Sequence, residues 1–197
     1  LGSVSGGSPC VVSPISGQPV PQILETYETR KGNHLLGSVA RYDLQGNVLW
    51  FRSYLEGTLH GIIVDDDGNI VVTGECRSPI IPDNLNPGFV LKYNPQPGTN
   101  PISYSGCLFQ SSQFLVMKLE PMNGDVIWAN LYGPEVDFAS TESRRGQGWD
   151  LELTYNSSLV NNGYRVVGRK SPGTVGGWGR EKPLLIDVSK AGDLNWQ

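Results

Sequence analysis

Short apolar stretches that alternate with polar residues run along the chain from Ile23 to its end. Each stretch is rich in Val, Ile, Leu, Tyr and Trp and is bounded by Gly, Asn, Asp or Pro, which is the pattern of β-strands. No stretch of ten or more residues has the spacing of an amphipathic helix. We therefore expect strands in ILETYET, SVARYD, NVLWFRSY, GIIVDDDGNIVVTGE, FLVMKLEP, DVIWANLYG, WDLELTYN, YRVVGRK, PLLIDVSK and DLNWQ.

The expected strands recur in a fixed order. One pass runs GIIVDD, NIVVTGE, FLVMKLEP and DVIWANLYG, and the next runs WDLELTYN, GYRVVGRK, PLLIDVSK and DLNWQ. An incomplete pass, GSVARYD and NVLWFRSYLEG, precedes both. Four antiparallel strands per repeat are the plan of a β-propeller blade. The pattern therefore predicts an all-β protein with about two and a half propeller blades.

The last hairpin of each pass carries a glycine four residues before a tryptophan. Glycine, or the residue beside it, supplies the positive φ of a tight hairpin turn, and the tryptophan then lies at a constant register in the next strand. A large buried indole at each blade interface would join neighbouring blades. We expect this docking role for Gly46 and Trp50, Gly124 and Trp128, and Gly192 and Trp196.

These motifs resemble the repeats of bacterial secreted β-propeller proteins. The similar stretches are ARYDLQGNVLW, IIVDDDGNIVVTG and MKLEPMNGDVIW, and the resemblance covers residues 37–76, 113–133 and 149–197. The first hairpin is also similar to the docking motif of quinoprotein propellers in Ala40, Gly46 and Trp50. It departs from that motif in Asp43, one place late, and in Gln45, where the motif has Thr. The resemblance implies a protein that acts outside the cell or on its surface.

The repeats do not fill the chain evenly. Successive tryptophans of the motif are farther apart than the roughly 40–50 residues of a compact blade, so we expect insertions at 77–112 and 134–148. Residues 1–22 are rich in Gly, Pro and Ser and are expected to form an irregular leader, followed by the repeats over 23–197. A closed propeller needs about four to eight blades. Either further chain beyond Gln197 or further copies of this chain would therefore complete the ring.

Composition excludes several classes of partner. Hydrophobic residues are 38% and charged residues 17% of the chain, which is too apolar for disorder. The net charge of -4 gives no basic footprint for a nucleic acid. No apolar run reaches the roughly 18 residues of a membrane span. The remaining partners are a protein, a glycan, or further copies or segments of the same propeller.

The three cysteines, Cys10, Cys76 and Cys107, form no CxxC pair. Cys76 and Cys107 bracket a Pro-rich segment, so a disulfide that closes this segment is one interpretation, and it requires an oxidising compartment. Separate buried thiols are the other interpretation. The odd count leaves Cys10 without an obvious partner.

Candidate chemistry is sparse. The acidic run at residues 65–67 offers carboxylates to calcium, but a strand follows at once, so we expect a hairpin turn and no cofactor, with calcium as the alternative. His34 and His60 show no metal-ligand spacing. A glycosidase would need a carboxylate pair such as Glu135 with Asp137, or Glu142 with Asp150. We expect no catalytic residues.

Aromatic residues in or beside the insertions are candidates for partner binding, because loop aromatics dominate many interfaces. They are Tyr132, Phe138, Trp149 and Trp178. The favoured function is a non-enzymatic extracellular or cell-surface propeller module that serves as a scaffold or binds a protein or glycan. The alternatives are a propeller enzyme, either a quinone-dependent dehydrogenase or a glycosidase, and a structural subunit of an oligomer or filament.

Overall fold

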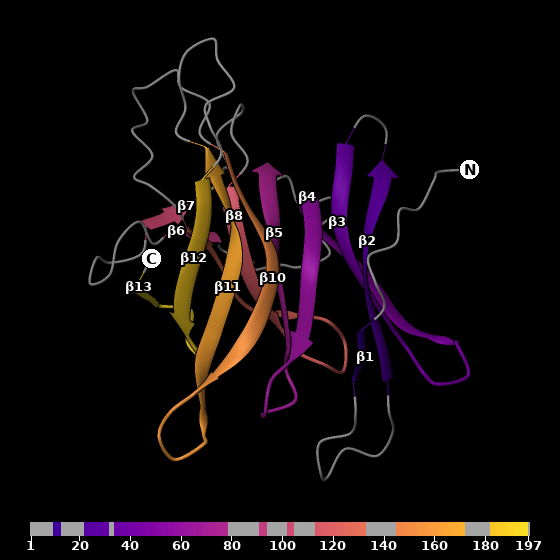
Figure 1. Ribbon diagram of the computed structural model, residues 1–197. Helices are drawn as coiled ribbons and strands as arrows, with labels where there is room; N and C mark the ends of the chain where they lie inside the picture. Colours follow the sequence, from indigo (N-terminus) through magenta and orange to yellow (C-terminus); the bar gives the residue numbers. More distant parts are fainter. Residues whose placement is uncertain are drawn as a thin grey trace.

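The protein is all-β, as the alternating pattern predicted. The computed structural model describes residues 10–12, 22–31, 34–78, 91–93, 102–104, 113–132, 145–171 and 182–196, and every regular element in these ranges is a strand (Figure 1). No helix among these residues is long and apolar enough to cross a membrane. The strands are β1 (Cys10–Val12), β2 (Gln22–Lys31), β3 (His34–Tyr42), β4 (Val48–Val64), β5 (Ile70–Ser78), β6 (Leu91–Tyr93), β7 (Ile102–Tyr104), β8 (Gln113–Leu119), β9 (Val126–Tyr132), β10 (Arg145–Tyr155), β11 (Asn161–Ser171), β12 (Lys182–Ser189) and β13 (Leu194–Trp196).

Hydrogen bonds join β1 to β9 into one nine-stranded sheet and β10 to β13 into a sheet of four strands. Strand β4 belongs to two antiparallel parts of the larger sheet. Its first part pairs with β3 and its second part with β5, and the pairing register shifts between Glu56 and Gly57. We call β1, β2, β3 and residues 48–56 the first sheet, residues 57–64 with β5, β8 and β9 the second sheet, and β10 to β13 the third sheet. Within each sheet, strands that follow one another in the chain are neighbours.

The first sheet is more complete than the sequence indicated. The repeat pattern predicts two strands in the first pass and leaves the strand ILETYET outside it, but β2, which contains ILETYET, pairs with β3 from Ile23 to Lys31, and β1 pairs with β2. Strand β1 lies inside the segment 1–22 that we expected to be irregular. Its three residues are too few to produce a recognisable alternation. Within the 77–112 insertion, β6 and β7 pair with each other, and β6 lies parallel to β9.

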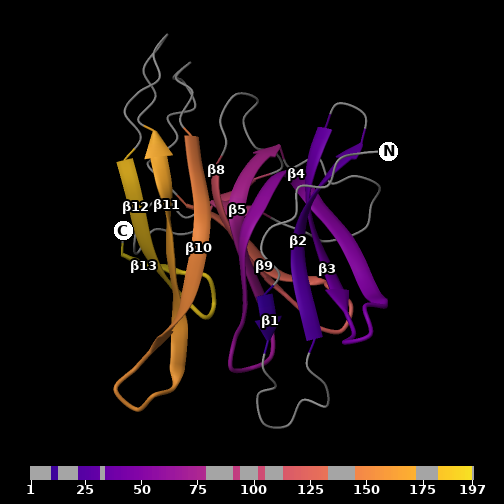
Figure 2. The ribbon, with the colours of Figure 1, turned by 45° about the vertical axis from the view of Figure 1, so that its right-hand side comes forward.

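The three sheets lie side by side, with the second sheet between the other two (Figures 1 and 2). The core between the first and second sheets consists of Leu24, Val39, Trp50, Tyr54, Leu59, Ile62, Ile70, Val72, Cys76, Leu115, Met117, Leu119, Ala129 and Leu131. The core between the second and third sheets consists of Val71, Phe114, Val116, Tyr132, Leu151, Tyr164, Val166, Leu184, Ile186, Val188 and Leu194.

Burial on both faces explains the sequence of the second sheet. Side chains alternate between the two faces of a strand, so Ile70 and Val72 enter one core while Val71 enters the other. A strand that is covered on both faces reads as a continuous apolar run, as IVV does in β5. The second sheet thereby holds the first and third sheets together.

Candidate functional site at the sheet interfaces

Three side chains of β4, the last strand of the first sheet, bind a turn of the second sheet. Trp50, Arg52 and Tyr54 share one face of β4 because they are two residues apart. Trp50 Nε1 donates to Pro121 O at 2.9 Å, Arg52 Nε to Asn123 O at 2.7 Å and Tyr54 Oη to Gly124 O at 2.8 Å. Arg52 also pairs with the carboxylate of Asp125 at 3.3 Å.

The same arrangement joins the second sheet to the third. Trp128 Nε1 donates to Lys190 O at 3.1 Å. Asn130 Nδ2 and Tyr132 Oη each donate to Gly192 O at 2.6 Å. We call the two sets of contacts the first and second turn clamps. Each clamp consists of a strand with the pattern Trp-x-Arg/Asn-x-Tyr and the glycine turn of the next sheet.

The second clamp corrects one prediction. We expected Tyr132 to be an exposed loop aromatic that binds a partner, but its side chain is 0% exposed. Strand β9 continues to Tyr132, which lies on the same face as Trp128 and is covered by the third sheet. Burial raises the pKa of the Tyr132 phenol far above its ordinary value, so it acts as a neutral hydrogen-bond donor.

Glycine is required in the two clamped turns for two reasons. Gly124 and Gly192 have φ of 74° and 89°, a region that favours glycine. A Cβ on Gly124 would lie 2.9 Å from the Trp50 ring, and one on Gly192 would lie 2.5 Å from Asn130 Nδ2. Gly46 also has a positive φ, 83°, but beyond its chain neighbours no described atom lies within 4 Å of the corresponding Cβ position.

The six residues predicted to dock blades thus fall into two groups. Trp50 and Trp128 lie over Gly124 and Gly192 at the two sheet interfaces. Trp196 and Gly46 lie at the two ends of the row of sheets. Trp196 is 42% exposed, and its described neighbour is Arg165, whose guanidinium carbon lies 5.8 Å from the centre of the ring.

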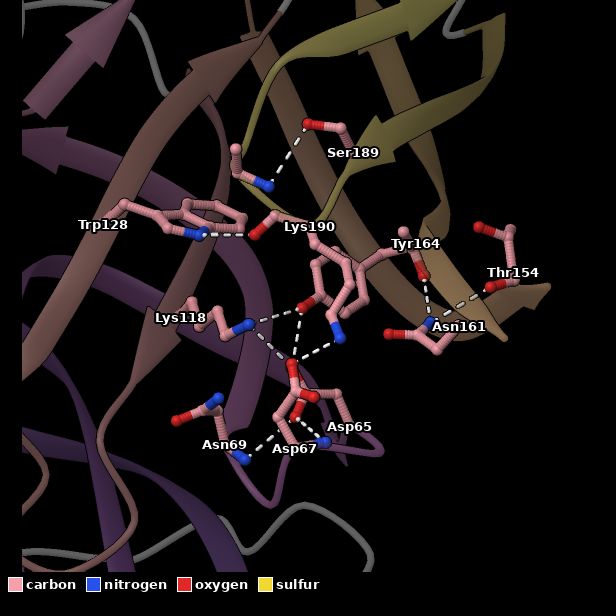
Figure 3. A network of polar contacts seen from close by, with 12 residues as sticks. Asp65, Asp67, Asn69, Lys118, Trp128, Thr154, Asn161, Tyr164, Ser189 and Lys190 are labelled. Atoms are coloured by element: carbon pink, nitrogen blue, oxygen red, sulfur yellow. Dashed lines mark hydrogen bonds and ion pairs between the residues drawn. The ribbon is translucent and has the colours of Figure 1, made fainter. Parts of the chain in front are cut away.

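A buried polar network lies beside the second clamp (Figure 3). Lys118 Nζ contacts Asp65 Oδ2 at 2.8 Å and Tyr164 Oη at 3.0 Å, and the Tyr164 hydroxyl donates to Asp65 Oδ2 at 2.8 Å. Asp65 and Lys118 belong to the second sheet and Tyr164 to the third. Burial, followed by the hydrogen bond to Asp65 and the nearby acidic charges, raises the pKa of Tyr164 far above its ordinary value.

The acidic run forms the predicted hairpin turn. Asp65 N donates to Asn69 O and Gly68 N to Asp65 O, and Gly68 has a φ of 84°. Asp65 Oδ1 accepts the amides of Asp67 and Asn69, while the Asp67 carboxylate pairs with the ammonium of Lys190 in the third sheet. Among the described residues, no group of three His, Cys, Asp or Glu side chains could hold a metal ion.

The outward face of the third sheet is the surface that points away from the second sheet. Strand register places there Asp150, Glu152, Arg165, Val167, Arg169, Leu185, Asp187 and Trp196. Asp150, Glu152, Arg165, Val167 and Leu185 line a depression of about 240 Å³, together with an edge of Leu151. At one end Trp149 lies on Arg169, with 5.3 Å between the ring centre and the guanidinium carbon.

The remaining predicted residues lie mostly outside the described part of the chain. Phe138, Trp178, Cys107 and the carboxylates Glu135, Asp137 and Glu142 fall there. Cys76 is buried in the core between the first and second sheets, and its pairing with Cys107 stays a prediction because Cys107 lies outside the described residues. Trp149 is exposed, as expected of a residue beside an insertion.

The network and the clamp tyrosines were not predicted. A signal for the tyrosines was present, because WFRSY and WANLY place Tyr four residues after each of the first two tryptophans. No comparable signal existed for Asp65 and Tyr164, which are 99 residues apart. Comparison with known proteins adds no assignment: no protein-family model matches the chain, and no curated protein matches it.

Proposed function

We propose that this protein is a non-enzymatic β-propeller-type module that acts outside the cell or on its surface. Its sheets serve as blades of a scaffold that presents the insertions at 77–112 and 134–148 to a protein or glycan partner. The observation that carries this proposal is the repetition of the turn clamp. The same three side-chain positions bind the equivalent turn at both interfaces between successive sheets, which is how a blade array builds a rigid frame from small repeats.

Burial supports a scaffold role for the polar side chains of the interior. Asp65, Lys118 and Tyr164 satisfy one another between two sheets. A buried, fully satisfied network of this kind fixes the geometry of a core. The open depression lies instead on the outward face of the third sheet.

The exposed aromatic Trp149 supports partner binding at the second insertion. It projects at a register shift of β10, between Gly148 and Asp150, and is held from below by Arg169. Bulges of this kind reorient a side chain at a functional edge. An exposed tryptophan that stacks on an arginine is typical of the anchor of a protein or glycan interface.

The proposal is tested by binding and turnover measured on the same preparation. The full chain is applied to an array of neutral and acidic oligosaccharides, and it is assayed with chromogenic glycosides and with alcohols in the presence of added quinone and an electron acceptor. We expect glycan binding that Trp149→Ala abolishes and Tyr155→Ala, an exposed control on the same strand, leaves intact. Turnover of any of these substrates would overturn the non-enzymatic function.

A further inference from the structure

We propose that the outward face of the third sheet binds the turn at residues 43–47 of a second copy of this chain, so that copies associate head to tail. The proposal rests on the proposed blade-type stacking of the sheets and identifies one of its partners. It follows from two complementary halves of a turn clamp, which the chain carries at opposite ends of its row of sheets.

The first half is Trp196. It pairs with Asp187 across β12 and β13, at the position where Trp50 pairs with Arg41 and Trp128 with Lys118. Both equivalent indoles lie on a turn of the next sheet and donate to its backbone. Trp196 has the same register and lies on the equivalent face of its sheet, but it is exposed and donates to no turn among the described residues.

The second half is the turn at residues 43–47. Its backbone hydrogen bonds, Gly46 N to Asp43 O and Asp43 N to Asn47 O, match those of the clamped turn at Ser189 and Gly192. Leu44 occupies the position of Lys190, whose carbonyl accepts the Trp128 indole. The space above Gly46, which an indole fills at Gly124 and Gly192, holds no described atom within 4 Å beyond its chain neighbours.

The composition of the outward face fits a protein partner. Two tryptophan–arginine pairs, Trp196 with Arg165 and Trp149 with Arg169, flank Val167 and Leu185, each of which is 42% exposed. Tryptophan and arginine are the residues most enriched at the energetic centres of protein interfaces. The face thus presents two apolar side chains between two arginines, beside the indole of Trp196 that would contact the turn.

A second exposed feature lies where the docked turn would meet the third sheet. Leu159 has a φ of 58°, which is unusual for a bulky residue, and it is 82% exposed. By its place in the turn, Leu159 is equivalent to Gly68, and the residue before it is equivalent to Asp67. At the second interface, Asp67 pairs with Lys190. In the proposed contact Leu44 replaces Lys190, so an apolar contact between Leu44 and Leu159 replaces that ion pair.

Because the two halves differ, the contact is heterologous: each copy uses one end to bind the other end of its neighbour. Such contacts extend from copy to copy into closed rings or open filaments. This property gives the proposal a specific test, since damage to different ends of two copies leaves one intact contact between them.

The test uses Trp196→Ala, which removes the inserted indole, and Leu44→Glu, which places a charge on the receiving turn. Sedimentation velocity from about 1 µM to about 1 mM covers the affinities of weak association. We expect the unmodified chain to exceed 21.5 kDa with rising concentration. Each variant alone should associate about 30-fold more weakly, as expected for loss of an interface anchor. An equimolar mixture should form a dimer of twice the chain mass and no larger species.

Two controls keep the result interpretable. Met122→Glu alters an even more exposed apolar residue in the turn that the first clamp already holds, and Ile127→Ala alters an exposed side chain on β9. Both should associate like the unmodified chain, and all variants should show the same circular dichroism spectrum. An unmodified chain that stays monomeric, or a mixture that fails to dimerise, overturns the proposal. The sheet-stacking function is judged separately, by the stability of the clamp variants Tyr54→Phe and Tyr132→Phe.

Discussion

The Tyr54 hydroxyl donates a 2.8 Å hydrogen bond to the carbonyl of Gly124, which lies 70 residues further along the chain and in the neighbouring sheet. Tyr132 makes the equivalent 2.6 Å bond to Gly192. Each phenol binds the same turn as the tryptophan of its clamp. Both bonds are buried, so each contributes to the attachment of one whole sheet to the next.

Replacement of either clamp tyrosine by phenylalanine should destabilise the fold. Tyr54→Phe and Tyr132→Phe each keep the ring but remove the donor, which leaves a buried glycine carbonyl with one partner fewer. The expected loss is about 1–3 kcal/mol of unfolding free energy, measured by urea denaturation. Tyr155→Phe, on an exposed ring, serves as the control. Equal stability of all three variants would contradict a contribution from the clamps.

The three turn glycines should respond differently to alanine. All three have positive φ, so each substitution should cost about 1–2 kcal/mol from the backbone alone. Gly124→Ala and Gly192→Ala should cost more, because the added methyl collides with the clamp side chains. Gly46→Ala is the internal control, and thermal denaturation of the three variants gives the order. A Gly46→Ala variant as unstable as the other two would refute the steric argument.

The buried network should be more sensitive to the loss of one charge than to the loss of both. Lys118→Met leaves the Asp65 carboxylate buried beside a neutral phenol, and removal of one member of a buried ion pair costs about 3–5 kcal/mol. In the double variant Lys118→Met/Asp65→Asn, the amide oxygen still accepts the turn amides and no charge is left unpaired. Urea denaturation should show the double variant to be more stable than Lys118→Met. The reverse order would exclude charge burial as the cause.

The contact between Asp67 and Lys190 should make stability depend on acid. The hydrogen bond from the Lys190 ammonium, together with the charges of Lys190 and Lys118, lowers the pKa of the Asp67 carboxyl. A carboxyl whose pKa is lower when folded stabilises the fold above its unfolded pKa of about 3.9, and the effect is lost as the pH falls through the folded pKa. Asp67→Asn should therefore flatten the dependence of the melting temperature on pH below about pH 5.

A second variant isolates the pair that causes this acid dependence. Lys190→Met removes the ammonium that pairs with Asp67, so it should also flatten the dependence of the melting temperature on pH below about pH 5. Added salt should reduce the acid dependence of the unmodified chain, because Asp67 and Lys190 are partly exposed. An acid dependence that survives both substitutions would assign it to other carboxyls.

The local features of the fold were predictable because they depend on residues that are close together in the sequence. Alternating apolar positions predicted the strands of the second and third sheets, and glycine spacing predicted the turns with positive φ at Gly46, Gly124 and Gly192. Strand β1 was missed because three residues show no period. The prediction for Tyr132 was wrong because its place next to an insertion was given more weight than its strand register relative to Trp128.

The contacts between sheets were less predictable because they depend on which distant strand lies opposite. The partners of Asp65 come from β8 and β11, and no short motif joins these positions. A lysine in an apolar strand gives a weak signal, since Lys118 needs a buried carboxylate that the sequence alone does not locate. The repeated Trp-x-x-x-Tyr spacing could have identified the clamp residues, although not the turns they bind.

Strand β4 serves as the last strand of the first sheet and as the first strand of the second. A single unbroken segment of 17 residues therefore carries the hydrogen-bond ladders of both sheets. When one sheet unfolds together with this segment, the other sheet loses the hydrogen-bond partners that the segment supplies. These two sheets should consequently melt as one cooperative folding unit, and a protease should find no hinge between them to cut.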